Sequence, residues 1–213
     1  MKKRDTSAST ARDYLGPYRE AADVHGADFG VTLWASEQSQ RRRFEVMTRM
    51  VYMPGKRVLD AGCSRGDFAA YMLERGVAYG RYIGVDALED VIAYARSREL
   101  PRAEFHVGDL VNDARLWRAG RPQIVAISGT LNTMDDEAVM TVLESAWEAA
   151  SQTLVFNFLS DCCGPKAPPQ FDAARRLDTI GLLRWAMRQT WAVQFRQDYF
   201  EHGHDATIVM RKA

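Results

Sequence analysis

Two carboxylates each end a short apolar run, and the first is followed by a glycine-containing turn. Asp60 closes the first run and precedes Gly62 and Gly66, and Asp86 closes the next run along the chain. Glycines in such a turn let the backbone approach a ligand closely. In nucleotide-binding α/β folds, an acid at the second place accepts both hydroxyls of a ribose. The spacing therefore predicts an adenosine-type site.

The charges around the turn indicate which adenosine ligand it holds. Dinucleotide-binding turns have glycine at the first, third and sixth positions. Here those positions hold Gly62, Ser64 and Asp67. The sixth position opens a helix, where a pyrophosphate would normally bind. Asp67 and Asp60 would repel a phosphate and favour a cationic ligand without phosphate, such as S-adenosylmethionine with its ammonium and sulfonium groups.

With these residues, the chain resembles the class I S-adenosylmethionine-dependent methyltransferases. Their first motif reads acid-x-Gly-x-Gly-x-Gly, and this sequence has Asp60, Gly62, Ser64 and Gly66, with serine for the middle glycine. Serine is tolerated at this place if the local φ is negative. The resemblance covers about residues 55 to 212 and implies a doubly wound, seven-stranded, mostly parallel sheet with an antiparallel C-terminal hairpin strand.

The resemblance also implies roles for single residues. Asp60 and the backbone of the glycine turn would hold the methionine part of the cofactor, and Asp86 the ribose. Asp109 would bind the adenine amino group, with a backbone N–H from Leu110 beside it. Ala87 is small enough for the adenine ring to lie flat. The expected cofactor-binding residues are Asp60, Gly62, Cys63, Ser64, Gly66, Asp86, Ala87, Asp109, Leu110 and Ser128.

The segment after the fourth expected strand faces the methyl group in this family. We expect Asn132 there, and Trp34 from the N-terminal part, to contact the acceptor. Enzymes that methylate amines of nucleic-acid bases carry an Asn/Asp-Pro-Pro-aromatic run at this place, and residues 128–133 contain none. Arg43 or Arg42 either holds the carboxylate of the cofactor or belongs to a solvated face.

Composition favours a soluble single-domain protein. The 213 residues, of 24.1 kDa, are 46% hydrophobic, and 28 basic residues balance 28 acidic ones. Net charge therefore gives no argument for a nucleic-acid partner. We expect no membrane span, no signal peptide, no metal site and a cytoplasmic location. Residues 1–54 are expected to form a tail and covering helices, and 55–213 the cofactor-binding domain.

Alternating strand and helix patterns predict a parallel sheet covered on both faces. Residues 1–12 are expected to be a frayed tail, 13–34 irregular covering segments, and 160–171, with three prolines, a lid or binding loop. The last expected helix carries Leu177, Ile180, Met187 and Trp191 on one face. Strands are expected at 57–61, 81–86, 103–107, 122–128, 153–159, 193–199 and 206–211, and other helices at 36–51, 66–75, 89–98 and 135–150.

Two further clusters have ordinary interpretations. The turn between the last two strands contains His202 and His204, which we interpret as a solvated turn; a general base from it stays open. Cys162 and Cys163 are adjacent, which strains a disulfide, so we interpret them as loop residues.

The sequence predicts a methyltransferase that acts on an O, N or C atom of a small or medium-sized acceptor. Two alternatives stay open: a non-catalytic protein that binds S-adenosylmethionine or S-adenosylhomocysteine, and a nicotinamide-dependent oxidoreductase, which the acidic sixth position disfavours. The motifs identify the cofactor and not the acceptor, and no catalytic residue is assigned.

Overall fold

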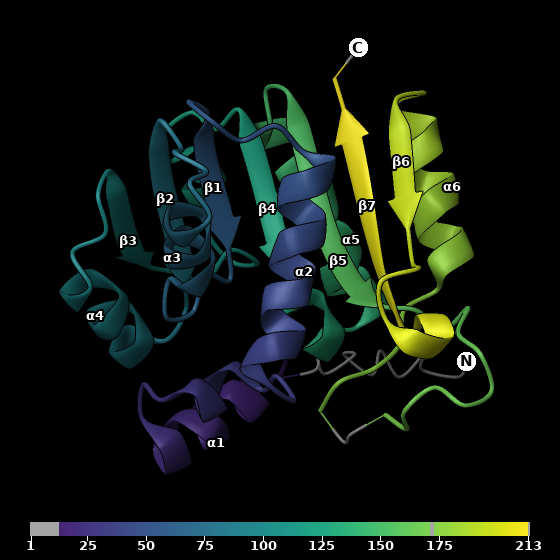
Figure 1. Cartoon of the computed structure of the whole chain (residues 1–213), viewed down its shortest axis with the longest axis horizontal. Helices are drawn as coiled ribbons and strands as arrows, with labels where there is room; N and C mark the ends of the chain where they lie inside the picture. Colours follow the sequence, from purple (N-terminus) through teal and green to yellow (C-terminus); the bar gives the residue numbers. More distant parts are fainter. Residues whose placement is uncertain (1–12, 171–172, 213) are drawn as a thin grey trace, which may run out of the picture.

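A seven-stranded sheet runs through the computed structural model, which describes residues 13–170 and 173–212 (Figure 1). Its order is β3-β2-β1-β4-β5-β7-β6, and β7 runs antiparallel to both neighbours. The predicted mostly parallel sheet with its antiparallel hairpin strand is confirmed. The expected tail at 1–12 lies outside the described residues. The strands are β1 Arg57–Ala61, β2 Arg81–Asp86, β3 Ala103–Val107, β4 Ile124–Ser128, β5 Thr153–Leu159, β6 Val193–Arg196 and β7 Asp205–Arg211.

Polar side chains fix where several helices begin. Ser36, Asp135 and Asp178 each accept a hydrogen bond from the backbone N–H three residues further on, as N-caps do. Within the described ranges, no helix is long and apolar enough to cross a bilayer. The helices are α1 Gly16–His25, α2 Glu37–Met50, α3 Asp67–Glu74, α4 Glu89–Ser97, α5 Asp136–Ala149 and α6 Thr179–Gln189, with 3₁₀ turns η1 Phe29–Thr32, η2 Leu116–Arg118, η3 Thr130–Thr133 and η4 Glu201–Gly203.

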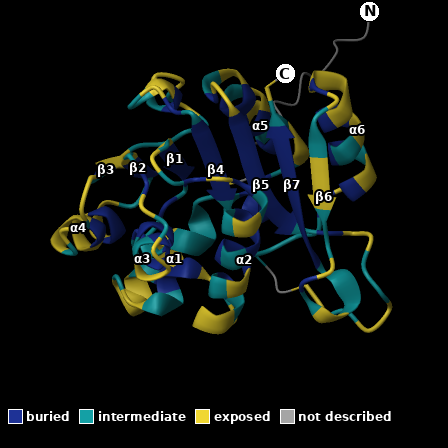
Figure 2. Cartoon of the chain, turned by 45° about the horizontal axis from the view of Figure 1, so that its top comes forward, coloured by how far each residue is buried: buried dark blue, intermediate teal, exposed yellow. Residues whose placement is uncertain are grey.

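Helices cover both faces of the sheet. One hydrophobic cluster joins α2, α3 and α4 to the sheet, and the other joins α5 and α6 to the opposite face. Alternate strand residues serve the two clusters: Val58 belongs to the first and Leu59 to the second, as the period of a strand requires. Strands β4, β5 and β7 are therefore buried along their length (Figure 2).

The strand order places the first turn at the centre of the molecule. The chain leaves β1 to build β2 and β3 on one side, and then crosses over to add β4 on the other. The crevice beyond the carboxyl ends of β1 and β4 is thus the switch point, where open α/β sheets bind ligands. α1 and the connection between β5 and α6 lie beyond this edge of the sheet (Figure 1).

The expectation of irregular structure at 13–34 is wrong for α1. This helix starts at Gly16, has Pro17 in its first turn, and is followed by Gly26 with φ 56°. Proline presets the helical φ at this position, and glycine at positive φ ends helices readily. The glycines therefore mark the ends of a helix, and not a segment without one.

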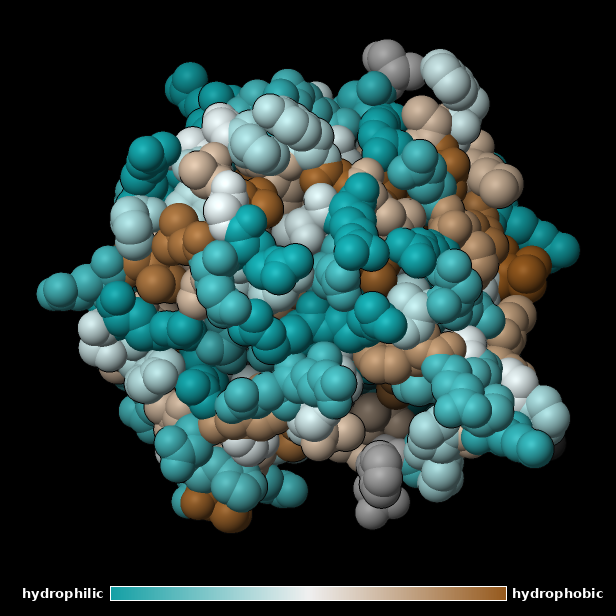
Figure 3. Space-filling model, in the orientation of Figure 1, coloured by the Kyte–Doolittle hydropathy of each residue, from teal (hydrophilic) through white to brown (hydrophobic). Residues whose placement is uncertain are grey.

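The predicted face of the last helix is also wrong. Ile180, Met187 and Trp191 are 46%, 63% and 84% exposed, while Leu182 and Trp185 are buried on the opposite side. Apolar residues occupy both sides of α6, so periodicity alone does not identify its core face. Hydrophobic side chains accordingly gather at the right edge of the molecule, where α6 and β6 lie (Figure 3).

Candidate active site

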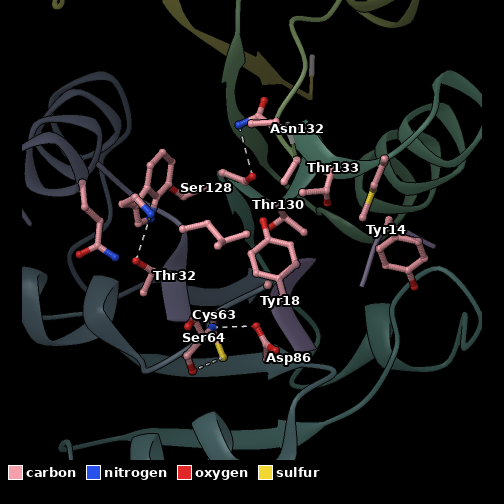
Figure 4. Close-up of a pocket in the computed structure, with 18 of the residues that line it drawn as sticks. Tyr14, Tyr18, Thr32, Cys63, Ser64, Asp86, Ser128, Thr130, Asn132 and Thr133 are labelled. Atoms are coloured by element: carbon pink, nitrogen blue, oxygen red, sulfur yellow. Dashed lines mark hydrogen bonds between the residues drawn. The ribbon is translucent and has the colours of Figure 1, made fainter. Parts of the chain in front are cut away.

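A cavity of about 670 Å³ opens at the carboxyl edge of the sheet, around the switch point. It brings together residues from α1, the turn after β1, the ends of β2 and β4, and the loop after β5. All but one of the residues predicted to bind the cofactor or the acceptor line it; Gly66 does not. The close-up in Figure 4 shows part of this lining, with Ser64 and Asp86 on one side and Asn132 on the other.

The turn after β1 is held to β2 through its backbone. The N–H groups of Gly62 and Cys63 both donate to the carbonyl oxygen of Val85, at 2.8 and 3.0 Å. Gly62 has φ 79°, and a Cβ there would overlap the side chain of Thr130. Gly66, at φ 71°, packs against Phe105, which a Cβ would approach to 2.8 Å. Glycine at 62 thus lets the Thr130 side chain pack against the turn, and glycine at 66 packs the turn against β3.

Ser64 differs from expectation. Its φ is 45°, in the left-handed region, and not negative. Its N–H donates to Asp86 Oδ2 at 2.9 Å. This hydrogen bond links the glycine turn to the acid at the end of β2 and supports a conformation that serine otherwise adopts at a cost. The serine therefore replaces a family glycine without changing the geometry that the glycine allows.

Asp60 is a buried acid beside the turn. Its carboxylate accepts a hydrogen bond from the Tyr82 hydroxyl. Burial raises the pKa of Asp60 to about 7, the negative charges of Asp86 and Asp67 add to the rise, and the Tyr82 hydrogen bond opposes it. A cationic group placed at Asp60 would favour the ionised carboxylate and lower this pKa again.

This pKa predicts how cofactor affinity depends on pH. Below about pH 7 the folded protein holds a proton on Asp60, which must leave before the carboxylate can pair with a ligand ammonium. Between pH 7 and 5.5 an α-amino group stays protonated, so the titration of Asp60 governs this window. We expect the affinity for S-adenosylhomocysteine, measured by calorimetry, to fall roughly tenfold over it. Asp60→Asn should bind more weakly at pH 7 and show a flat profile; an unchanged slope in that variant contradicts this role.

Asp86 lies at the end of β2 with its carboxylate at the cavity. Oδ1 accepts from the Leu88 N–H at 3.0 Å, and Oδ2 from the Ser64 N–H. Burial raises the pKa of Asp86, and these backbone hydrogen bonds oppose the rise. Each carboxylate oxygen retains a further lone pair. Asp86 is thus rigidly placed and can still accept from a ligand.

Asp67 changes the charge argument made from the sequence. Its carboxylate pairs with Arg98 at 2.7 Å and lies 3.7 Å from Arg65 Nε. The protein itself therefore compensates this charge. The acids without an arginine partner at this end of the cavity are Asp60 and Asp86 among the described residues.

Asp109 follows β3 and contacts α1. It accepts from the Tyr14 hydroxyl, from the Val111 N–H at 2.9 Å and from Asn112 Nδ2 at 2.7 Å. Partial burial raises the pKa of Asp109, but these hydrogen bonds outweigh it and leave the pKa below its ordinary value. Asp109 is therefore a fixed, ionised hydrogen-bond acceptor in the wall of the cavity.

Sequence reasoning missed the contribution of α1. Tyr14 and Tyr18 both line the cavity, and Tyr18 lies on its Asp86 side (Figure 4). Burial raises the pKa of Tyr18 to about 12, and the charge of Asp86 adds to the rise. Tyr18 lies on α1, and Tyr14 lies just before the helix begins at Gly16. Pro17 was the available signal for the start of this helix, but the flanking glycines obscured it.

The end of β4 is tied to β5 by two asparagines. Asn132, predicted to contact the acceptor, donates to Gly129 O at 3.3 Å and accepts from the Leu159 N–H at 2.9 Å. Asn157 accepts from the Gly129 N–H at 2.8 Å and donates to Ser128 Oγ at 3.3 Å. Asn132 lines the cavity, but both ends of its amide already serve the backbone. Asn157 was not singled out from the sequence.

Trp34 lies over Gly129. A Cβ at Gly129, whose φ is 80°, would overlap the Trp34 ring. The Arg43 guanidinium stacks between Trp34 and Phe200, 4.2 and 4.6 Å from their ring centres. Arg43 Nε also donates to Asp205 Oδ2 at 2.6 Å. Arg43 is thus a buried, paired residue that fixes Trp34, whereas Arg42 lies on the surface with Glu45.

Gly129→Ala is expected to displace Trp34 from the end of β4. Methyl transfer should slow at least tenfold, by order of magnitude, because positioning of the acceptor is lost, while affinity for S-adenosylhomocysteine should change little. Gly55→Ala is the matched control, since Gly55 also has positive φ (71°) but would place its Cβ in open space. Equal loss of turnover in both variants would show that backbone strain, and not Trp34, causes the effect.

The histidine pair and the cysteine pair differ in their relation to the cavity. His204 lines the cavity and His202 does not. The His204 ring packs against Phe200, and its Nδ1 lies 3.1 Å from Glu201 O, which can only accept, so Nδ1 carries the proton. Neither Cys162 nor Cys163 lines the cavity. In the described part of the chain, no group of His, Cys, Asp and Glu converges as metal ligands.

Comparisons with known proteins agree with this geometry. Residues 58–152 match the family model described as a methyltransferase domain. No curated protein matches the sequence. The magnesium protoporphyrin IX methyltransferase of Synechocystis PCC 6803, with bound S-adenosylhomocysteine, superposes with a TM-score of 0.65 at 14% identity, covering 95% of this chain and 97% of that one.

Two further solved structures have the same fold. A methyltransferase from Archaeoglobus fulgidus matches with a TM-score of 0.62 at 16% identity, over 83% of this chain and 95% of that one. Phosphoethanolamine N-methyltransferase 1 of Haemonchus contortus, with phosphoethanolamine and S-adenosylhomocysteine, matches with a TM-score of 0.67 at 14% identity. The match covers 94% of this chain and 48% of that one. Residues 58–152 thus match a methyltransferase domain, and the chain has the fold of these S-adenosylmethionine-dependent methyltransferases.

Proposed function

We propose that this enzyme transfers the methyl group of S-adenosylmethionine to an O, N or C atom of a small or medium-sized acceptor. The observation that carries the proposal is one continuous cavity of about 670 Å³ with two chemically different halves. The half around the β1 turn is acidic. The other half is lined by Trp34, Leu159 and Pro168, among others. A volume in this range suits small-molecule sites.

The acidic half fits the cofactor residue by residue. Asp60 suits an ammonium group, because a cation beside the buried carboxyl group favours its ionised form. Asp86 presents a fixed carboxylate to a pair of ribose hydroxyls, and Asp109 presents one to an exocyclic amine. Gly62 leaves the approach to the turn open. We assign these residues to the methionine, ribose, adenine and backbone contacts respectively.

The reaction requires mainly that the protein positions the methyl donor and the acceptor. When bound, S-adenosylmethionine supplies an electrophilic methyl group on an activated sulfonium. The residues of this chain then orient the acceptor in line with that methyl and exclude water. Trp34 covers the end of β4, and Tyr18 on α1 and Tyr14 just before it line the cofactor half. This arrangement supports catalysis without a nucleophilic side chain.

A small acceptor is favoured over a macromolecule by the cavity and the charge. The net charge is zero, and residues 128–133 lack the motif of base-amine methylation. We also propose that residues 1–54 act as a cover over the domain formed by 55–213. α1 and Trp34 support this division because both line the cavity from above the sheet edge.

The test is methyl transfer from labelled cofactor into fractionated cell extract. Label should appear in the fraction of low molecular mass, and Asp86→Ala, which cannot hold the ribose, should give none. Label in protein or nucleic acid would contradict the proposal. Cofactor binding without transfer to any fraction would instead support a non-catalytic binding protein.

A further inference from the structure

Arg176 lies in the acceptor half of the cavity and is held from three sides by backbone. Its Nη1 donates to Ser160 O at 2.9 Å and to His204 O at 3.2 Å, and its Nη2 donates to Pro168 O at 2.7 Å. The side chain lines the cavity. Because the flexible arginine stem is already fixed by these hydrogen bonds, a ligand that binds the guanidinium would pay little for ordering it.

The charge of Arg176 has no acidic partner among the described residues. No carboxylate lies within ion-pair distance of it there, and its three hydrogen-bond acceptors are neutral carbonyls. Arg43, the other arginine of the cavity wall, is paired with Asp205. Half-buried charges are normally paired. A purely structural arginine would explain the hydrogen bonds, but not why a cation without an acidic partner among the described residues faces a cavity.

The carboxylates of the cavity all lie at its other end. Asp60, Asp67, Asp86 and Asp109 belong to the cofactor half, so the cavity has one acidic and one cationic end. An acceptor with a negative group would be attracted to Arg176 and repelled by those acids that have no arginine partner among the described residues, Asp60, Asp86 and Asp109. Charge alone would therefore set the direction in which the acceptor enters.

The strand order gives the span between the two ends. Methyl transfer is expected at the end of β4, and Arg176 binds the backbone where β5 ends and β7 begins. Adjacent strands are about 4.8 Å apart, and β5 and β7 lie one and two strand spacings from β4, so these places are separated by roughly 5 to 10 Å. Apolar side chains, including Trp34, Leu159 and Pro168, line the space between them.

We propose that the acceptor has an apolar body of up to roughly 10 Å and a carboxylate or phosphate at the end remote from the methylated atom, bound by Arg176. The inference rests on the proposed function and narrows its substrate class. Arg176 is a specificity-determining residue in this account.

The test uses probes of matched length on protein saturated with S-adenosylhomocysteine. Octanoate, octyl phosphate and neutral octanamide are titrated by calorimetry, and the two anions tell a carboxylate site from a phosphate site. At least one anion should bind about tenfold or more tightly than the amide. Arg176→Met should abolish this preference, Arg176→Lys should retain part of it, and Arg184→Met, on the exposed side of α6, should leave it unchanged.

Affinity for S-adenosylhomocysteine, measured on each variant, shows that the fold and the cofactor half are intact. The inference is overturned if the wild-type protein binds anion and amide equally. It is also overturned if no anion binds at about 10 mM, a concentration that would reveal even a weak site. An anion preference that survives in Arg176→Met overturns it as well. Transfer of label to neutral small molecules, together with no calorimetric binding of the anions, would contradict this inference and still support the proposed function.

Discussion

Gly62→Ala should abolish measurable cofactor binding. The new Cβ would overlap Thr130, whose hydroxyl donates to Ala61 O at 3.0 Å and so cannot turn away freely. It would also stand in the turn where the cofactor backbone contacts are made. We expect a loss of affinity for S-adenosylhomocysteine of about 100-fold or more, since overpacking typically costs 1–3 kcal/mol and the lost contacts add to it. Titration calorimetry measures it directly.

Gly76→Ala is the control for this prediction. Gly76 has φ 71°, close to that of Gly62, but a Cβ there meets nothing within 4 Å. Both variants carry the same backbone strain, and only Gly62→Ala should lose the ligand. In a Gly62→Ala background, Thr130→Ala removes the hydroxyl and methyl and should restore part of the affinity. If Gly76→Ala binds as poorly as Gly62→Ala, strain explains the loss and the turn has no special role.

Asp86→Ala should have the second large effect. A hydrogen bond to a charged group contributes about 1.5–3 kcal/mol, so losing two acceptors for ribose hydroxyls predicts a fall in affinity of roughly 100-fold or more. The Ser64 and Leu88 N–H groups also lose their acceptor. Asp86→Asn, which keeps one acceptor oxygen, should therefore lie between the wild-type protein and Asp86→Ala.

The control acid is Asp113, which lies after β3, pairs with Arg115 and does not line the cavity. Asp113→Ala should bind S-adenosylhomocysteine as the wild-type protein does. Thermal unfolding without ligand tells whether Asp86→Ala is folded. A folded Asp86→Ala that binds at wild-type affinity would remove Asp86 from the site.

The sequence was most informative where residue type fixes both geometry and chemistry. Glycine at 62 and acids at the ends of two apolar runs were predicted to lie together, and they line one cavity because parallel strands bring these ends to one edge. The hairpin strand β7 was likewise predictable, since its short, largely apolar run is that of a strand buried on both faces. Antiparallel pairing of β5 with β7 over their full lengths confirms it.

What could not be predicted depends on contacts remote in sequence. Asp67 appears as a free charge until Arg98 is placed beside it, and Asn132 as a free amide until β5 lies next to it. Ser64 takes a positive φ because Asp86 accepts its N–H from another strand. Arg176 stands in a proline-rich loop, and only the tertiary fold brings it to His204 and the cavity.

The central claim is that the turn after β1 binds a cationic nucleoside without phosphate. Titration calorimetry of the purified protein with S-adenosylhomocysteine and, separately, with NAD tests it most directly. We predict saturable binding of S-adenosylhomocysteine at micromolar concentration and no heat of binding with NAD up to millimolar concentration, values that correspond to about 8 and 4 kcal/mol. Tight binding of NAD with none of S-adenosylhomocysteine would contradict the account.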